Sequence, residues 1–145
     1  MKYWATVLMA AAAAAAAGDT KPETKTKKPS LELRATPRTA FSPATVHFTA
    51  ELTGGDDSET YYCPEIEWEW GEGGKSVHEA DCAPYEDGST KIERRFTASH
   101  GYNLAGIYTI KVTLRKASRT IVSQTVRVTI RAGLGDPTQE GNENH

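Results

Sequence analysis

The sequence has few cysteines, no long hydrophobic run and none of the common catalytic motifs. Only two cysteines occur among 145 residues. The longest apolar run, residues 3–17, falls short of the roughly 20 residues that a membrane-spanning helix needs. G-x-S-x-G, H-E-x-x-H and a phosphate-binding loop are all missing, and no amphipathic helical pattern follows residue 17. These absences exclude a polytopic membrane protein and a long coiled coil, and they leave no motif for assigning catalysis.

The first 17 residues have the composition of a secretory signal peptide. Lys2 supplies a positive charge, residues 3–17 are apolar apart from Thr6, and small residues around Ala17 provide a cleavage site. We therefore predict that residues 1–17 are removed and that the mature protein is extracytoplasmic, in the periplasm or secreted, without stable membrane insertion. The alternative is an uncleaved anchor or a helical extension.

The remaining hydrophobic residues are concentrated in one stretch. After residue 17, 39 of 40 hydrophobic residues lie between Leu31 and Ala132, so residues 31–132 are predicted to form a single domain. Residues 18–30 contain no hydrophobic side chain and predict a disordered linker, and residues 133–145 predict a disordered tail. This length leaves no room for a second domain or a large cofactor enzyme.

Hydrophobic and polar residues alternate with a period of two almost throughout 31–132. This period is typical of half-buried strands, and turn residues such as Gly54, Gly55, Asp87 and Gly88 separate the segments. The alternating segments are 31–36, 45–52, 65–70, a weaker one at 90–97, 108–115 and 122–130. About seven short strands predict an all-β, immunoglobulin-like antiparallel sandwich.

Cys63 and Cys82 are predicted to form a disulfide. They close a loop of 20 residues, for which chain entropy gives a stabilisation of about 3 kcal/mol. A small exported domain gains from such a bond. Because Cys63 precedes the third strand and Cys82 follows it, the bond would hold a loop and not the core. The alternative is a metal site formed with His78, although two cysteines without C-x-x-C spacing give little support for it.

Two linked motifs resemble the PKD domain, an immunoglobulin-like sandwich named from the polycystic kidney disease protein. The first, W-E-W-G-E-G at 68–73, is similar to the family's W-x-F-G-D-G. The second, H-G-Y-N-L-A-G-I-Y at 100–108, is similar to its H-x-Y-x-x-x-G-x-Y run. The matching residues are Trp68, Trp70, Gly71, Gly73, His100, Tyr102, Gly106 and Tyr108. Glu72 departs from the family's Asp, and the cysteine-bearing excursion at 75–89 is unusually long.

The same residues have a structural interpretation. Gly71 and Gly73 allow a sharp turn at a strand end. Trp68 and Trp70 point to one face of a strand, and a tyrosine hydroxyl at 102 would fix the backbone of a corner before the next strand. We therefore expect core and corner roles for the motif, in preference to contacts with a ligand.

Charge is strongly divided along the chain. Residues 54–87 sum to −10 and residues 88–132 to +8, although the whole chain carries −2. The pattern predicts outward glutamates at 65, 67 and 69 beside outward basic residues at 111, 115, 127 and 131. Such a row disfavours Glu67 and Glu69 as a glycosidase pair, because an exposed face offers no cleft. The pI of about 6.1 argues against nucleic-acid binding.

Two acidic, tyrosine-containing loops at 54–62 and 75–87 are the candidate ligand surface. Their residues are Asp56, Asp57, Glu59, Tyr61, Tyr62, Asp81 and Tyr85. The only cofactor suggested is Ca²⁺, through Asp56, Asp57 and Asp81, although no D-x-D-x-D-G pattern is present. The alternatives are a solvated acidic loop and tyrosines packed against the sandwich edge.

These patterns favour a secreted, non-catalytic PKD-like module that binds an extracellular or envelope protein or polysaccharide. The alternative is a structural or assembly subunit of the cell envelope that docks through an exposed strand edge. A Ca²⁺-binding accessory module and a hydrolase are less favoured, because short loops on a sandwich of 102 residues leave no pocket.

Overall fold

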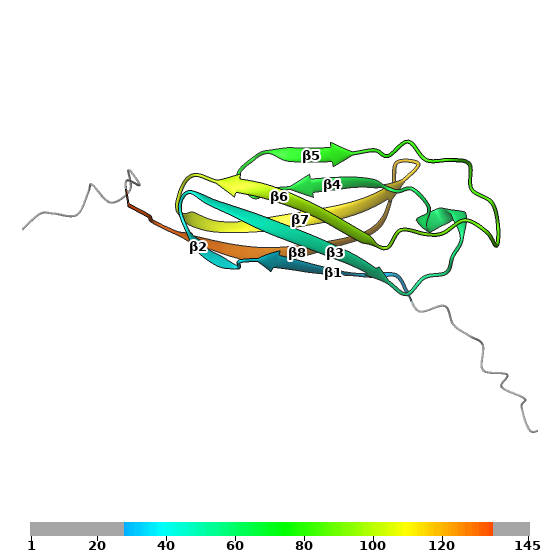
Figure 1. Ribbon diagram of the computed structural model, residues 1–145, viewed down its shortest axis with the longest axis horizontal. Coiled ribbons are helices and arrows are strands. Elements are labelled where there is room, and N and C mark those ends of the chain that lie inside the picture. Colours follow the sequence, from blue (N-terminus) through cyan, green and yellow to red (C-terminus); the bar gives the residue numbers. More distant parts are fainter. Residues whose placement is uncertain (1–27, 135–145) are drawn as a thin grey trace, which may run out of the picture.

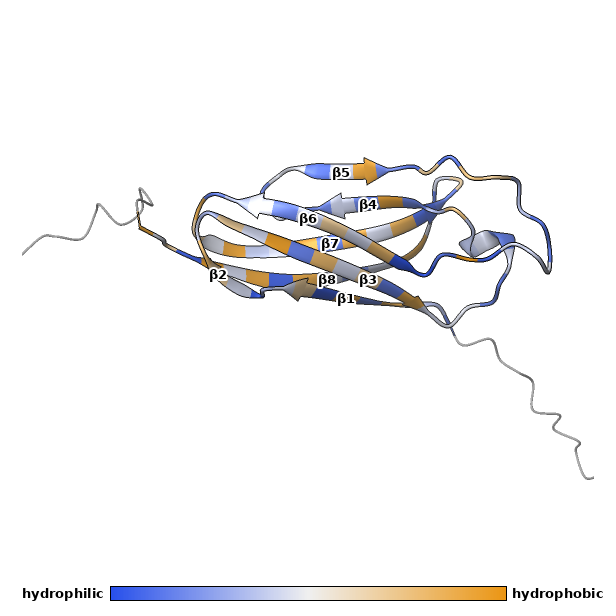
Figure 2. Cartoon of the chain, viewed as in Figure 1, coloured by the Kyte–Doolittle hydropathy of each residue, from blue (hydrophilic) through white to orange (hydrophobic). Residues whose placement is uncertain are grey.

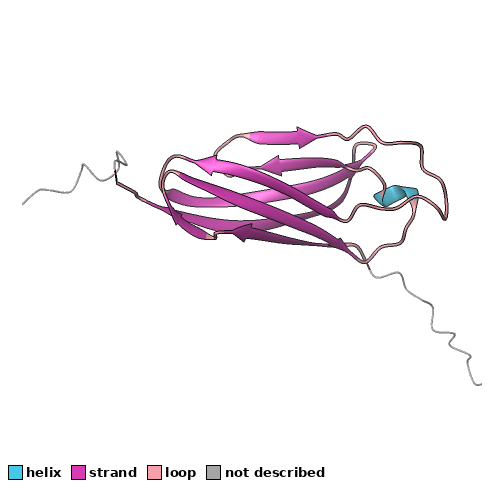
Figure 3. Ribbon diagram, viewed as in Figure 1, coloured by secondary structure: helices cyan, strands magenta, loops and turns pink. Residues whose placement is uncertain are grey.

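The computed structural model describes residues 28–134, which form two packed β-sheets (Figures 1 and 3). The predicted signal peptide, most of the linker and residues 135–145 lie outside the described residues. Within 28–134, no helix is long and apolar enough to span a membrane. The elements are β1 (Ser30–Thr36), β2 (Thr39–Phe41), β3 (Ala44–Thr53), η1 (Glu59–Tyr61), β4 (Glu65–Glu69), β5 (Lys75–His78), β6 (Arg95–Tyr102), β7 (Gly106–Lys116) and β8 (Arg119–Arg131).

The two sheets have the strand orders β1-β3-β6 and β2-β8-β7-β4-β5. All pairs are antiparallel except β2 with β8. β1 and β2 are consecutive in sequence but belong to opposite sheets, and the chain crosses between them at Pro37 and Arg38. This arrangement is an immunoglobulin-like sandwich, so the predicted fold class is confirmed.

The core lies between the sheets and uses the inward residues of the alternating strands. Figure 2 shows the alternation of hydrophobic and hydrophilic residues along β3, β7 and β8. The largest fully buried side chains are Tyr102, Phe48, Ile110, Leu114, Ile130, Val46, Val112 and Val128. The outward positions carry threonine, glutamate, lysine and arginine, as expected for a sheet with one face in water.

The predicted strand at 90–97 is wrong in its first half, because β6 begins only at Arg95. The register pairs Glu51 with Arg95, and only Leu52 and Thr53 of β3 lie beyond this pair, so residues 90–92 run past the end of β3. β6 instead extends to Tyr102, so His100 and Tyr102 lie within a strand. The corner follows them at residues 103–105.

β2 and β5 were not predicted from the alternation. β2 has three residues, and all four residues of β5 are exposed. Neither strand therefore has a buried face that would produce a period in the sequence. Their strand conformation comes from pairing with β8 and β4.

The sandwich has two different ends. At the corner end lie the turn at 71–74, the corner at 103–105 and the end of the described chain. At the loop end lie the loop at 54–64, the excursion at 79–94 and the β7–β8 hairpin turn. In Figure 1 the corner end is on the left and the loop end on the right.

Candidate functional site

The motif tryptophans form part of a continuous aromatic stack at the corner end. The rings of Trp68 and Trp70 are stacked with centroids 5.5 Å apart and planes 2° apart. The His100 ring stacks on Trp70 at 4.4 Å, and Tyr102 meets His100 edge-on at 4.9 Å. Tyr108 continues the series, 4.3 Å from Tyr102.

Hydrogen bonds fix this stack to the backbone. The Tyr102 hydroxyl donates to the Trp70 carbonyl at 2.9 Å, and the Tyr108 hydroxyl donates to the Leu104 carbonyl at 2.7 Å. Burial raises the pKa of Tyr102 well above its usual value, so it stays a donor. The Glu72 carboxylate forms a hydrogen bond with the His100 ring. Trp68, Trp70 and Tyr102 are buried, whereas His100 and Tyr108 are half-buried at the corner end.

Gly71 brings the turn at 71–74 close to β7. Its φ is +82°, and a Cβ there would lie 2.8 Å from the Thr109 carbonyl oxygen. A larger residue would strain the backbone and collide with it. Gly73 also has a positive φ, of 86°, and Gly106 begins β7.

At the loop end the predicted disulfide between Cys63 and Cys82 is present, with Cα atoms 6.3 Å apart. It joins the end of the first loop to the excursion, so it holds loops and not the core. The alternative metal site with His78 is excluded, since both sulfurs are in the disulfide.

The candidate tyrosines tie the two loops together. Tyr62 donates its hydroxyl to the Ala83 carbonyl at 2.6 Å, and Tyr85 donates to the Asp57 carbonyl at 2.5 Å. The rings of Tyr62 and Tyr85 lie 5.6 Å apart. Tyr61 packs against the core and lies over Gly55. These contacts match the packing alternative, and they leave little free aromatic face for stacking a ligand.

Arg94 is a loop-end residue that the sequence did not single out. Its guanidinium donates to the Gly54 carbonyl at 2.9 Å, to the Asp56 carbonyl at 3.2 Å and to the Asp57 carboxylate at 3.1 Å. It therefore joins the end of the excursion to the first loop. In the sequence, Arg94 is one of two adjacent arginines, and nothing in that pattern predicts this role.

The acidic residues of the two loops do not form a common site. Hydrogen bonds from the Ser58 side chain and then from its backbone N–H lower the pKa of Asp56, and the N–H lies 3.1 Å from the Asp56 carboxylate. Asp57 pairs with Arg94. Glu59 begins η1, and Asp81 belongs to the excursion. Within residues 28–134, no group of three His, Cys, Asp or Glu side chains is close enough to hold a metal ion.

The structure forms a groove behind the disulfide that the sequence did not predict. This β6 groove has a volume of about 450 Å³ and lies between the edges of the two sheets. Buried Ile66, Trp68 and Phe96 provide its apolar floor. The polar and disulfide residues around it are Tyr62, Cys63, His78, Cys82, Lys91, Glu93, Arg95 and Thr97.

The groove runs beside an unpaired strand edge. The Leu52 N–H donates to the Arg94 carbonyl at 2.7 Å, and alternate residues of an antiparallel ladder face opposite ways. The backbone N–H and C=O groups of Arg95 and Thr97 therefore point away from β3. Within the described part of the chain, β6 pairs with β3 alone. A short extended segment would find hydrogen-bonding partners along this edge.

The outward charge row is confirmed for two of the four predicted basic residues. Lys111 lies 4.0 Å from Glu69, and Arg115 lies 3.5 Å from Glu67. Arg127 and Arg131 are on β8, one strand further from the glutamates, and Arg127 faces Thr109 in the ladder. Glu67 and Glu69 are thus each beside a basic side chain, and Glu67 is buried, at 8% exposed, where the sequence pattern had predicted an exposed position.

Comparison with known proteins gives similarity at the level of the fold. No family model matches the chain, and no curated protein matches its sequence. Among solved structures, the PKD domain of an M14-like peptidase from a Thermoplasmatales archaeon is 19% identical, with a TM-score of 0.49, covering 70% of this chain and 92% of that one.

Two further solved structures match with lower identity. The CARDB domain of a Pyrococcus furiosus protein, in complex with di-metal ions, is 7% identical, with a TM-score of 0.47, covering 72% and 94% of the two chains. A DUF4785 family protein from Legionella pneumophila is 10% identical, with a TM-score of 0.40, covering 74% of this chain and 29% of that one. These similarities concern the fold alone, so the function must be inferred from this chain's own residues.

Proposed function

We propose that the protein is a non-catalytic, extracytoplasmic binding module that takes an extended segment of a partner protein into the β6 groove. The carrying observation is that the apolar floor of this groove lies beside the unpaired edge of β6. Main-chain hydrogen bonds along a free edge give affinity, and alternate side chains of the added segment enter the groove. The signal-like N-terminus and the disulfide support a location outside the cytoplasm.

The groove suits one extended segment better than a large flat partner. Ile66, Trp68 and Phe96 are at most 8% exposed, so the floor is recessed. Above it the exposed side chains of Lys91 and Arg95 lie near a single acid, Glu93. Residues of either charge therefore suit the ends of a bound segment, and an apolar residue suits its centre.

The test is a pair of substitutions at Thr97. Thr97→Pro removes an N–H that points away from β3, so the sheet loses no ladder bond, as is typical for proline on an edge strand. Thr97→Ala is the matched control, because it shortens the side chain and retains the N–H. The full chain is screened against a displayed library of random peptides, and the enriched peptides are measured against both variants.

We expect enriched peptides that bind wild type and Thr97→Ala alike and that bind Thr97→Pro at least about tenfold more weakly, the effect of losing roughly one well-made hydrogen bond. Thermal melting checks that both variants fold. Absence of enriched peptides would refute the proposal, and so would equal binding to the two variants. Selective binding on a glycan array together with a failed peptide screen would favour the polysaccharide ligand instead.

A further inference from the structure

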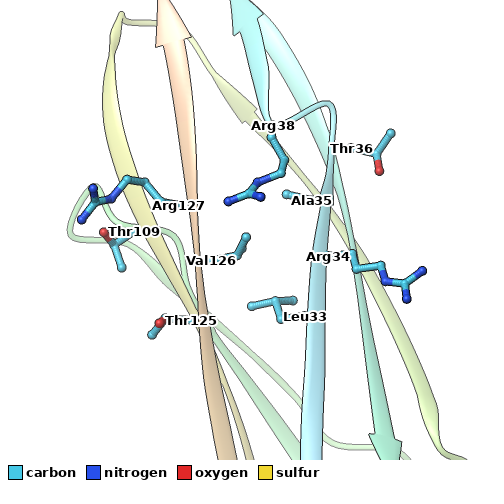
Figure 4. Close-up of a pocket in the computed structure, with 9 residues that line it drawn as sticks. All are labelled: Leu33, Arg34, Ala35, Thr36, Arg38, Thr109, Thr125, Val126 and Arg127. Carbon is cyan, nitrogen blue, oxygen red and sulfur yellow. The ribbon is translucent and has the colours of Figure 1, made fainter.

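A second groove lies at the seam between β1 and β8, away from the β6 groove. It has a volume of about 720 Å³ and includes Arg34, Arg38 and Arg127 in its lining. Figure 4 shows Arg38 reaching from the β1–β2 turn into the space between β1 and β8. Arg127 extends along the outer face toward Thr109, and Arg34 points to the opposite side.

Within the described part of the chain, two of these three arginines have no acidic partner. Arg34 pairs with Glu32 at 2.6 Å. Across residues 28–134, no acidic side chain forms an ion pair with Arg38 or Arg127, and the groove lining contains no Asp or Glu. Arginine stays charged at any physiological pH. The groove therefore presents two exposed guanidinium groups whose hydrogen-bond donors are available to an anion.

The positive surface continues across the outer face of the five-stranded sheet. Thr109 and Thr125 also line a neighbouring groove of about 350 Å³, together with Lys111 and Lys75. Thr125, Lys111, Glu69 and Lys75 stand opposite one another on β8, β7, β4 and β5. Three strand spacings span about 14 Å. The basic track, defined as Arg38, Arg127, Lys111 and Lys75, thus crosses the sheet with one acid, Glu69, along it.

The floor of the track is low where it meets the turn at 71–74. Gly71, Gly73 and Gly74 line the neighbouring groove of about 350 Å³ and contribute no side chains. Gly71 is held against Thr109, as described above. Beside this turn, a chain of sugar residues therefore meets backbone on one side and the Lys111 and Lys75 side chains on the other.

We propose that the basic track binds a polysaccharide carrying carboxylate or sulfate groups at intervals along its chain. Arginine makes paired, charge-assisted hydrogen bonds to both kinds of anion. The hydroxyls of Thr36, Thr109 and Thr125 provide neutral donors and acceptors for sugar hydroxyls. Neither groove has an aromatic side chain in its lining, so unpaired bases would find no stacking surface, which disfavours a nucleic acid.

The experiment measures binding of the full chain to four probes at low and high salt. Polygalacturonate carries carboxylates, dextran sulfate carries sulfates, unmodified dextran is uncharged, and oligothymidylate is an anionic nucleic acid. Arg38→Glu and Arg127→Glu are the test variants. Arg119→Glu is the matched control, because it reverses one exposed arginine on the same strand as Arg127, eight positions away at the loop end.

We expect binding to at least one anionic polysaccharide, no binding to dextran, and a fall in affinity as salt increases. Each test variant should bind about tenfold or more weakly, the effect of losing a hydrogen bond to a charged group. Arg119→Glu and Thr97→Pro should bind like wild type, so this result is independent of the β6 groove. A preference between the two anionic polysaccharides identifies the anion.

Three results would overturn the proposal. The first is no binding to either anionic polysaccharide. The second is an equal loss of affinity in Arg119→Glu and Arg127→Glu, which would indicate attraction by overall charge. The third is binding of oligothymidylate at least as tight as that of the polysaccharides. Melting curves verify that the exposed-site variants remain folded.

Discussion

At the corner end, stacked aromatic side chains from β6, β7 and the end of β4 close the sandwich, whereas at the loop end two loops are tied to each other. Trp70 and Tyr102 are at most 4% exposed and are joined by a hydrogen bond of 2.9 Å. The loop end instead uses a disulfide, two tyrosine hydroxyls and the Arg94 guanidinium, all in or near exposed segments.

The difference shows which end can change without loss of the fold. Packing at the corner is cooperative with the core, because Trp70 also contacts Phe48 with ring centroids 5.5 Å apart. The contacts between the loops are made mainly by a disulfide and by hydrogen bonds in exposed segments, so we expect them to order the loops more than they stabilise the sheets. Binding residues are commonly carried on such loops over a rigid scaffold. The β6 groove lies next to the loop end, in agreement with this division.

The largest expected effect is that of Trp70→Ala. The substitution leaves a cavity among Phe48, Trp68 and His100, and removal of a buried aromatic residue costs about 3–5 kcal/mol. Chemical denaturation measures the free energy of unfolding, and Trp70→Phe should recover part of it. A loss no larger than that of an exposed substitution, below about 0.5 kcal/mol, would show that the corner is not part of the core.

The disulfide should contribute about 3 kcal/mol, from the entropy of closing its loop in the unfolded chain. The variant with both Cys63 and Cys82 replaced by Ala is expected to lose this amount. Hydrogen exchange should accelerate more at 79–94 than in β7 and β8, where the slowest amides report only the change in global stability. Acceleration in β7 and β8 that exceeds the acceleration at 79–94 would show that the loop end supports the whole sandwich, contrary to the comparison drawn here.

Two tyrosine hydroxyls allow the ends to be compared by the same substitution. Tyr102→Phe leaves the Trp70 carbonyl buried without this partner, which costs about 1–3 kcal/mol. Tyr62→Phe removes the hydrogen bond to the Ala83 carbonyl in an exposed segment, where water can replace it, so the loss should be below about 1 kcal/mol. Equal losses in the two variants would contradict the difference between the ends.

The sequence predicted those features of the fold that have a local pattern of their own. Alternation predicted β3, β4, β7 and β8 because their inward residues are apolar, and the disulfide followed from the spacing and context of two cysteines. The tryptophan and tyrosine motifs predicted that Trp68, Trp70 and Tyr102 are buried at the corner end. Local patterns of this kind are predictive because each reflects one buried face of a single strand.

The grooves could not be predicted in the same way. The β6 groove exists because the excursion at 79–94 does not pair with β6, and nothing in its composition states where it runs. The basic track depends on the register that aligns Thr125, Lys111 and Lys75 across four strands. Both sites depend on how distant segments lie relative to one another, which a single sequence does not display.

The smallest effect concerns two glutamates beside the disulfide. A hydrogen bond with Glu79 raises the pKa of Glu65, and desolvation and the Glu79 charge act in the same direction. An acid whose pKa is raised by folding stabilises the native state below its ordinary pKa, and this stability is lost as pH rises through the folded pKa. Glu79→Gln removes the repulsion and keeps a hydrogen-bond donor. We therefore expect a higher melting temperature than wild type at neutral pH.

This gain should shrink as the pH is lowered to about 4, near the ordinary pKa of glutamate, because the wild-type pair then shares a proton. Melting curves from neutral pH to about 4 measure the difference. Glu59→Gln is the control, since it removes an exposed charge from the same end without a contact to Glu65. If the gain in melting temperature of Glu79→Gln stays constant over the whole pH range, the shared proton is refuted. The gain would then reflect the net charge of the loop end, and Glu59→Gln should show the same gain.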